Sequence, residues 1–366
     1  MKVTEVELIP FALPFERPYA SARGTLERRE MLLVRLRTDG ELEGLGEAVP
    51  LSLRRGADLG MIERALLRAS RRFRRADLSD FSGDEPLRAA VETFIHVAAG
   101  RRLPGPAKSA LEMALFDLAG KASDKPVWAL LGASEAIPVR CNATLVAAAP
   151  DEVAADARRW AARGFGTFKL KLGTGDDVAQ VRAVREALGP EAKLRLDANG
   201  TWSVAEALGV LRMVEPLDVE LVEQPVAELR ELAEVSAGTS IPVAADESVE
   251  RGKDAQRATG ACDLATVKLA KVGGIGEANG ISGHLPIYLS SALDGPLGIA
   301  AAAHAAQALR FEGAAAGLAH GLATQLLFSA TVASRESTLD GDLLSAPPGP
   351  GLGVEVDEKA LEKRRI

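Results

Sequence analysis

The chain has 366 residues, and at the usual length of about 100–200 residues per domain this predicts two domains, or one barrel with an addition. Hydrophobic residues make up 47% and charged residues 26%, which excludes a disordered or collagen-like chain, and the formal net charge of −7 argues against a nucleic-acid partner. Two cysteines cannot form a disulfide framework, and the sequence has neither a signal-peptide pattern nor a run of about 18 apolar residues, so we expect a soluble, cytoplasmic protein without a membrane partner.

The first hundred residues are predicted as strands followed by helices. Alternating apolar residues indicate antiparallel strands over Val3–Leu13, Glu30–Thr38 and Leu42–Ala48. Helical periodicity follows over Met61–Arg75 and Leu87–Ala99. Strands followed by helices predict an α+β domain.

Two segments rich in glycine and proline punctuate this region. We interpret the polar segment Phe15–Thr25, between the first two strands, as a mobile loop. The segment Gly100–Pro106 marks the predicted domain boundary.

Strands and helices alternate along the rest of the chain, after an apolar helix predicted over Ala107–Ala122. The predicted strands are Ile137–Leu145, Thr167–Leu172, Lys193–Asp197, Val219–Val222, Val243–Ala245, Leu264–Leu269 and Pro286–Ser290. The predicted helices are Pro150–Arg163, Asp176–Leu188, Val204–Met213, Ala227–Ala237 and Lys253–Gly260. This alternation implies parallel pairing, in either an open doubly wound sheet or a closed barrel. No Gly-rich dinucleotide fingerprint follows the early strands, which disfavours the open sheet of Rossmann type.

Polar residues recur at the C-terminal ends of these apolar strands. They are Lys169, Lys171, Asp197, Glu223, Asp246, Lys268, Ser290 and Ser291. From Lys171 to Ser290 the steps are 26, 26, 23, 22 and 22 residues, which is about the length of one βα unit in a barrel of about 250 residues. A closed barrel gathers such residues at one mouth, where barrel enzymes place their active sites.

The order of charges along this series indicates a chemistry. Three consecutive strands end in a carboxylate, and three carboxylates held together repel one another unless a cation is present. An all-oxygen ligand set favours a hard ion such as Mg²⁺. A metal and a neighbouring ammonium both favour a neutral lysine, which is a competent general base. Metal with lysine bases is an arrangement that removes a proton next to a carboxylate.

Six motifs resemble the enolase superfamily, specifically its muconate-lactonizing-enzyme subgroup, and the resemblance covers nearly the whole chain. The motifs are the helix text Ala107–Lys121, Lys169-Leu-Lys171, Asp197-Ala-Asn199, Glu223-Gln-Pro225, Asp246-Glu-Ser248 and Lys268–Gly274. The resemblance implies an α/β fold, a modified TIM barrel of (β/α)7β type over residues 105–346. It also implies an α+β capping domain built from residues 1–104 and the C-terminal tail 347–366, with Phe15–Thr25 as its substrate-covering loop.

The resemblance also assigns roles to the polar residues. Asp197, Glu223 and Asp246 would hold Mg²⁺, with Mn²⁺ as the alternative ion. Lys171 would be the base on one face of the substrate, Lys268 would act from the opposite face, and Lys169 would support charge beside the metal. Lys271 is interpreted as a loop lysine beyond its strand, and Asn199 as a residue that supports a metal ligand. The residues expected to contact substrate are Tyr19, Arg23, Asn142, Asn199, Ser290 and Ser291.

The substrate must be inferred from positions outside the shared machinery. The penultimate strand ends in Ser290 and Ser291 rather than in histidine, which is unlike mandelate-racemase-type members. Dipeptide epimerases of this family usually carry an Asp-x-Asp near the last strand to hold the substrate ammonium. The corresponding stretch here, Gly313–Ala330, contains no aspartate, so the resemblance implies that this group is missing. Instead, four stretches are similar to the o-succinylbenzoate synthases: Phe11–Pro18, Ser21–Leu26, Leu289–Ala306 and Gly317–Phe328. Asp294-Gly295-Pro296 departs from their pattern and leaves the pocket there undefined.

The similarity implies a Mg²⁺-dependent lyase of menaquinone biosynthesis. It would carry out the syn-dehydration of a succinyl-hydroxy-cyclohexadiene-carboxylate through a metal-stabilised enediolate, with N-acylamino-acid racemisation as a possible second activity. The alternatives are N-acylamino-acid racemase, dipeptide epimerase and muconate cycloisomerase, and, in a different class, a catalytically silent barrel that serves as a binding module. The expected partner is a small-molecule carboxylate, and the sequence leaves a homo-oligomer open.

Overall fold

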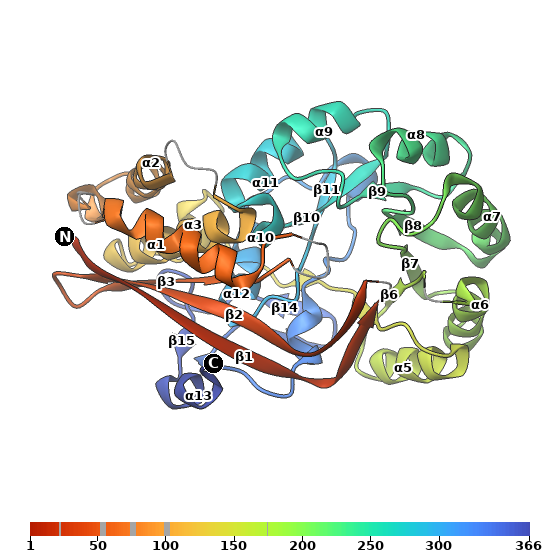
Figure 1. Cartoon of the computed structure of the whole chain (residues 1–366), viewed down its shortest axis with the longest axis horizontal. Coiled ribbons are helices and arrows are strands. Elements are labelled where there is room, and N and C mark those ends of the chain that lie inside the picture. Colours follow the sequence, from red (N-terminus) through yellow and green to blue (C-terminus); the bar gives the residue numbers. More distant parts are fainter. Residues whose placement is uncertain (22, 52–55, 74–77, 99–102, 174) are drawn as a thin grey trace.

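The computed structural model describes residues 1–21, 23–51, 56–73, 78–98, 103–173 and 175–366. At the N-terminal end, strands β1 (Val3–Ser21), β2 (Gly24–Thr38) and β3 (Glu43–Ala48) form an antiparallel sheet in that order. Helices α1 (Leu59–Phe73) and α2 (Pro86–Ala98) follow, as Figure 1 shows. The predicted α+β order is confirmed, although the predicted helix ends at Arg75 and Ala99 lie outside the described residues.

Within the segment predicted as a mobile loop, the described residues 15–21 and 24–25 continue strands β1 and β2, so the loop prediction was wrong. Tyr19 pairs with Leu26 and Ala20 with Thr25 across β1 and β2. The register shifts between Pro14 and Tyr19, at the kind of irregularity where a strand tolerates proline because no N–H is needed there. The hairpin therefore extends from the sheet to the barrel (Figure 1).

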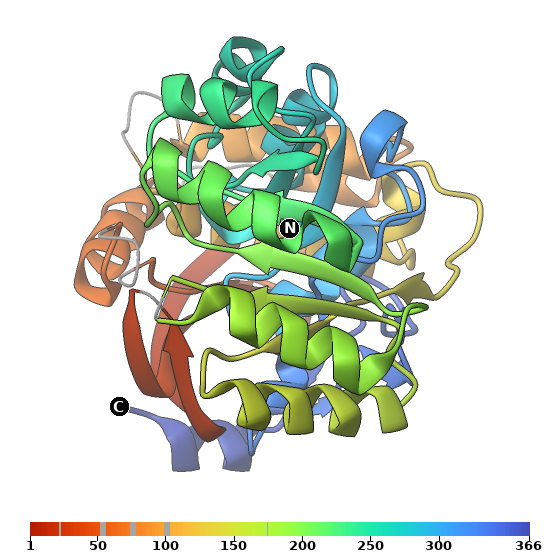
Figure 2. The ribbon, with the colours of Figure 1, turned by 90° about the vertical axis from the view of Figure 1, so that its right-hand side faces the viewer.

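The described residues of the second half form a curled parallel sheet of seven strands in sequence order. They are β5 (Ala143–Leu145), β6 (Thr167–Lys171), β7 (Lys193–Asp197), β8 (Val219–Glu223), β9 (Val243–Ala245), β10 (Leu264–Lys268) and β11 (Ile287–Ser290). The helices are α5 (Pro150–Ala162), α6 (Asp177–Leu188), α7 (Val204–Val214), α8 (Leu229–Ala237), α9 (Gly252–Ala258), α10 (Leu269–Val272), α11 (Ile275–Ser282) and α12 (Pro296–Ala305). Figures 1 and 2 show α5 to α9 around the outside of the sheet.

Two residues close this sheet into a barrel. His320 bridges to Cys141 beside β5, and Gly321 bridges to Ser290 of β11, both in parallel. The backbone bonds agree, because Asn142 N donates to His320 O at 2.8 Å and Gly321 N donates to Leu289 O at 2.8 Å. The eighth strand of the predicted (β/α)7β barrel is thus only a short bridge, and the predicted fold class is confirmed.

Helix α3 (Gly105–Ala122) packs between the N-terminal sheet and the barrel. Gly44 and Gly46 of β3 allow this approach, since a Cβ on Gly46 would lie 2.0 Å from Ala110 O. The buried Asp117 of α3 accepts bonds from Leu45 N and from Leu352 N, both at 2.8 Å, and so joins the sheet to the C-terminal region. Although α3 is buried along its length, none of the helices described here is long and apolar enough to cross a bilayer.

The C-terminal region returns to the N-terminal sheet. Its elements are β12 (Ala333–Arg335), β13 (Thr338–Asp340), β14 (Leu343–Ser345), which pairs with β4 (Val139–Arg140), β15 (Glu355–Val356) and α13 (Glu358–Arg364); the short α4 (Val127–Leu130) follows α3. Glu358 pairs with Arg35 of β2, and Ile366 N donates to Pro10 O at 3.2 Å. Figure 2 shows this last helix beside the hairpin. These contacts support our proposed division into a cap of residues 1–104 and 347–366 and a barrel of residues 105–346.

Candidate active site

The strand register brings the polar strand ends to one level inside the barrel. Lys171 pairs with Asp197, Asp197 pairs with Glu223, and Lys268 pairs with Ser290 on neighbouring strands. Asp246 follows the last residue of β9 directly. The three carboxylates at this level are fully buried, which is costly for charged groups unless partners compensate them.

Lysine ammonium groups are those partners. Lys169 Nζ lies 2.6 Å from Glu223 Oε2 and 2.9 Å from Asp197 Oδ2, and so bridges two carboxylates. Lys171 Nζ lies 2.6 Å from Asp197 Oδ2, and Lys268 Nζ lies 2.5 Å from Asp246 Oδ2. The site is therefore a buried network of alternating charge.

The network sets the protonation states. Burial alone lowers the pKa of Lys171, but the Asp197 carboxylate outweighs burial and holds that pKa above its ordinary value. The pKa of Lys169 is raised in the same way by Asp197 and Glu223. Both lysines are thus ammonium ions beside these carboxylates. The expectation of a neutral lysine base assumed a metal ion bound next to the lysine, which would lower its pKa.

Two residues with positive φ support the carboxylates. Asn199 (φ 49°) donates its backbone N–H to Asp197 Oδ1 at 3.0 Å and accepts from Lys171 Nζ through its side-chain oxygen at 3.1 Å. Gln224 (φ 38°) accepts the backbone N–H of Asp246 at 2.8 Å. Asparagine tolerates this backbone region better than most residues, which makes the Asp-Ala-Asn motif structurally apt.

The carboxylates suit a hard divalent cation by donor chemistry. They supply only oxygen ligands, and Glu223 Oε1 is buried without a hydrogen-bond partner among the described residues; Lys268 Nζ is 3.7 Å away. As the side chains stand, no three His, Cys, Asp or Glu residues of the described ranges converge closely enough to hold a metal. The reason is visible in the contacts, because lysine ammoniums lie against the oxygens that a cation would use.

Lys271 was interpreted as a loop lysine, and the structure contradicts this. Lys271 is buried in α10, where its Nζ lies 2.9 Å from Asp246 Oδ1 and also donates to Asp246 O. The short helix that begins directly after β10 turns Lys271 back toward the strand ends, which the loop interpretation did not consider.

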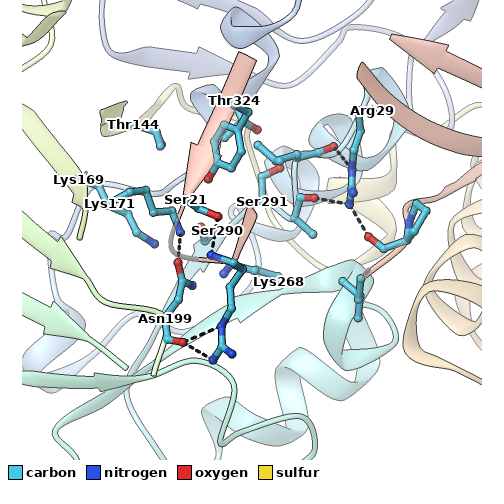
Figure 3. Close-up of a pocket in the computed structure, with 16 residues that line it drawn as sticks. Ser21, Arg29, Thr144, Lys169, Lys171, Asn199, Lys268, Ser290, Ser291 and Thr324 are labelled. Carbon is cyan, nitrogen blue, oxygen red and sulfur yellow. Dashed lines mark hydrogen bonds between the residues drawn. The ribbon is translucent and has the colours of Figure 1, made fainter. Parts of the chain in front are cut away.

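A cavity of about 70 Å³ opens beside the network (Figure 3). Its lining includes Lys169, Lys171 and Lys268 and five of the six residues predicted to contact substrate, namely Tyr19, Arg23, Asn199, Ser290 and Ser291. The structure does not bring Asn142 to this cavity. Asn142 is buried, and its side-chain amide donates to Ala143 O at 3.1 Å.

The cap holds the loop that follows β11 through a buried arginine. Arg29 of β2 donates to the carbonyl oxygens of Ala292 at 2.8 Å and Leu293 at 3.3 Å, and also to Pro50 O (Figure 3). Leu293 packs with Phe15 and Tyr19 of the hairpin. The cap thus covers the cavity from two sides.

The stretch that departs from the family pattern has a structural role at the contact between the cap and the loop after β11, which we call the seam. This stretch is Asp294-Gly295-Pro296. Asp294 accepts bonds from Ser291 Oγ at 2.8 Å and from Ala292 N at 2.7 Å, which holds the Ser291 hydroxyl at the cavity edge. Gly295 N donates to Glu47 Oε1 of β3 at 2.7 Å, and a Cβ on Gly295 would lie 2.5 Å from Glu47 Oε2. A side chain at position 295 would therefore require the ends of the Glu47 and Met31 side chains to shift.

Glu47 gives this seam a testable pH dependence. Burial, and secondarily the negative charge of Asp294, raises the pKa of Glu47 from 4.5 to about 8. Because the folded protein binds this proton more tightly than the unfolded chain does, protonated Glu47 contributes to the free energy of unfolding. This contribution is fully present below the pKa of Glu47 in the unfolded chain and is lost as pH rises toward about 8. Glutamine at position 47 does not titrate. Between pH 4.5 and about 8, the free energy of unfolding of Glu47→Gln should therefore rise relative to that of the wild type by up to about 1.4 kcal/mol per pH unit. Urea denaturation of both proteins across this pH window measures the difference. A difference that stays constant across the window would contradict this.

Sequence reasoning missed a second polar layer beneath the carboxylates. Arg195, Thr266 and Tyr288 are fully buried, two residues before Asp197, Lys268 and Ser290 on their strands. The period of two along a strand is the signal that places them on the same inward face. Burial, and then the Glu223 carboxylate, raises the pKa of Tyr288, so its hydroxyl keeps its proton.

Several known proteins are similar to this chain. The chain is 32% identical to an L-Ala-D/L-Glu epimerase of Bacillus subtilis over 97% of each chain. It is 39% identical to an o-succinylbenzoate synthase of Thermobifida fusca over 184 residues, 48% of this chain and 56% of that one. Among solved structures, a dipeptide epimerase from Cytophaga hutchinsonii complexed with Mg and the dipeptide D-Ala-L-Val superimposes with a TM-score of 0.88 at 27% identity, over 99% of this chain and 98% of that one.

Two family models cover most of the chain. The mandelate racemase/muconate lactonizing enzyme N-terminal domain matches residues 3–132, and the enolase C-terminal domain-like model matches residues 152–360. The relatives include epimerases, racemases, a muconate cycloisomerase and a synthase, so the chain is an enzyme by family. The chain belongs to the enolase superfamily, in its muconate-lactonizing-enzyme subgroup.

Proposed function

We propose that the chain is a divalent-cation-dependent o-succinylbenzoate synthase, a cytoplasmic lyase of menaquinone biosynthesis. It would dehydrate a succinyl-hydroxy-cyclohexadiene-carboxylate. The similarity to the Thermobifida fusca synthase supports this, although that match covers only about half of the chain, whereas the match to the Bacillus subtilis epimerase runs along nearly all of it. We favour the dehydration substrate over a dipeptide because of the charge of the cavity lining.

The observation that carries the proposal is the absence of an acidic side chain from the described cavity lining. The lining carries lysine and arginine but neither aspartate nor glutamate, in the part of the chain that the structure describes. A dipeptide brings a free ammonium, which needs an anionic partner when it is buried. The dehydration substrate carries two carboxylates and no ammonium, so it needs no acidic partner and suits a lining whose charged side chains are lysine and arginine.

The residues that would hold the cation are Asp197, Glu223 and Asp246. A divalent cation held there would supply positive charge that stabilises the charge developing on the substrate carboxylate. Lys169, which contacts two of these carboxylates, would support the same charge.

Lys171 and Lys268 would move or stabilise charge at the reacting carbon. Lys171, once neutral, would take the proton next to the substrate carboxylate and then deliver it to the departing hydroxyl, so that water leaves and a carbon–carbon double bond forms. Lys268 approaches the cavity from β10, on the other side of the carboxylate arc from β6, and would act from the second face. Ser290, Ser291, Tyr19 and Arg23 would complete the walls.

N-Acylamino-acid racemase is the second candidate, for a specific reason. Both Lys171 and Lys268 line the cavity, and racemisation needs one proton acceptor on each face. Acylation also removes the charge of the amine, so this substrate class needs no acidic partner. We therefore propose racemisation of N-acylamino acids as a second activity of the same site.

The test is turnover of the dehydration substrate by the purified chain with Mg²⁺. Mass spectrometry should detect loss of one water, and N-succinylamino acids assayed alongside should racemise more slowly. Muconate and dipeptides complete the panel. No dehydration together with efficient turnover of a dipeptide would overturn the proposal while leaving the lysine and carboxylate roles open to the same assay.

Removing divalent cations should abolish activity. EDTA treatment followed by desalting is expected to lower the rate below detection, because the three carboxylates then hold the lysines as ammonium ions. Adding Mg²⁺ or Mn²⁺ should restore the rate with a stoichiometry of one ion per chain. Full activity after rigorous chelation would rule out the proposed metal site.

A further inference from the structure

Two hydrogen bonds connect Thr266, Tyr288 and Glu223, and we call this chain the relay. Thr266 and Tyr288 lie beneath the level of the three carboxylates. Tyr288 of β11 has its hydroxyl 2.5 Å from Glu223 Oε2, and Thr266 Oγ1 of β10 lies 2.9 Å from the same hydroxyl. An ionised carboxylate only accepts, so the Tyr288 hydroxyl must donate its single proton to Glu223. Thr266 must then donate to Tyr288, which fixes the direction of the whole relay.

The Tyr288 ring is itself held in place by a buried arginine. The guanidinium of Arg195 lies over the ring, 5.0 Å from its centroid. Arg195 is anchored by Glu220 Oε2 at 2.5 Å and by Ala319 O at 2.6 Å. On the other sides the ring packs with Leu221 and other apolar residues of the barrel interior.

A β-bulge makes this anchor available. The register between β7 and β8 shifts after Leu194, so that Leu194 pairs with Val219 while Arg195 pairs with Leu221. Glu220 is the extra residue, and a bulge re-aims the side chain it carries. Glu220 therefore reaches Arg195, which points into the barrel, instead of facing the outer helices.

The two oxygens of Glu223 consequently differ. Oε2 accepts from Lys169 Nζ at 2.6 Å and from the Tyr288 hydroxyl at 2.5 Å. Oε1 is buried and accepts no hydrogen bond from the residues that the structure describes, and its ion-pair partner, Lys268 Nζ, is farther away at 3.7 Å. Without the tyrosine hydroxyl, the carboxylate could rotate and exchange the two oxygens.

We propose that Tyr288 is a positioning residue for the cation site: its hydroxyl, oriented by Thr266, holds Oε2 of Glu223 and thereby presents Oε1 to the divalent cation. This inference rests on the proposed function, because it takes Glu223 as a metal ligand. Partners that orient a metal ligand in this way are typically worth about 10–100-fold in metal affinity.

The experiment is calorimetric titration of the full chain, freed of metal, with Mn²⁺ and with Mg²⁺. Tyr288→Phe removes only the hydroxyl and should weaken binding by about 10–100-fold. Thr266→Val keeps the side-chain volume and should weaken binding in the same direction, but by less. Glu223→Gln should lose most of the binding. Ser109→Ala, which removes a buried hydroxyl of α3 without a hydrogen-bond partner in the described structure, is the matched control and should bind as the wild type does.

The possible outcomes separate the relay from the site. Wild-type binding together with a Tyr288→Phe affinity within twofold of it would overturn the relay and leave the proposed function intact. No binding by the wild type, or unchanged binding by Glu223→Gln, would overturn the metal site and the relay with it. Circular dichroism of each variant before titration checks that it is folded, and if Tyr288→Phe does not fold, unchanged affinity in Thr266→Val overturns the relay.

Discussion

Replacing Lys171 with alanine is expected to abolish dehydration. Removing a general base typically costs about 10²–10⁴-fold in rate, and more when the same group also returns the proton as the acid. Among the described residues, Lys169 is held between Asp197 and Glu223 and Lys268 approaches from the other face, so neither is placed to replace Lys171 as the base on its own face. The measurement is kcat for the dehydration substrate at saturating Mg²⁺.

The variant should remain folded and should still bind metal. Asp197 Oδ2 keeps Lys169 at 2.9 Å, so alanine at position 171 does not leave this buried carboxylate without a partner. Lys253→Ala, which removes an exposed lysine of α9, is the matched control and should retain full activity. A Lys171→Ala variant that is folded, metal-bound and as active as the control would remove Lys171 from the mechanism.

Replacing Lys268 with arginine should separate the two activities. Arginine keeps the positive charge beside Asp246 but cannot accept a proton, because its pKa exceeds about 12. Dehydration needs only one base if the removal is syn, so Lys268→Arg should retain part of it. Racemisation needs an acceptor on each face and should be lost.

Hydrogen exchange in D₂O makes this prediction specific to one enantiomer. The wild type should exchange the α-hydrogen of both enantiomers of an N-succinylamino acid, as followed by ¹H NMR. Lys268→Arg should exchange only the enantiomer whose hydrogen faces Lys171. Exchange of both enantiomers by Lys268→Arg at the wild-type rate would contradict the two-faced arrangement.

The level of the site residues could be predicted from sequence because parallel strands repeat at a regular interval. Lys171, Asp197 and Glu223 stand at equal steps along the chain, and the register places them side by side. The apolar strands themselves were recognisable from composition, since buried parallel strands are apolar on both faces. The barrel and its mouth followed from these two properties.

Other features depend on contacts that no local pattern encodes. The inward turn of Glu220 comes from a register shift between two strands. Closure of the barrel rests on bridges made by His320 and Gly321, too short to leave an alternating pattern. The hairpin segment looked like a loop because Pro14 and Pro18 break its periodicity, while its pairing partner lies across the turn.

The described lining of the cavity offers no carboxylate to an ammonium ion, and the proposed substrate class rests on this. The most direct measurement of this claim is the ratio of kcat/KM for the dehydration substrate to kcat/KM for a dipeptide such as L-Ala-L-Glu, with the same wild-type preparation and the same Mg²⁺. A buried unpaired charge costs several kcal/mol, so the ratio should exceed about 10³ in favour of dehydration. A ratio below one, with the dipeptide epimerised faster, would contradict the account.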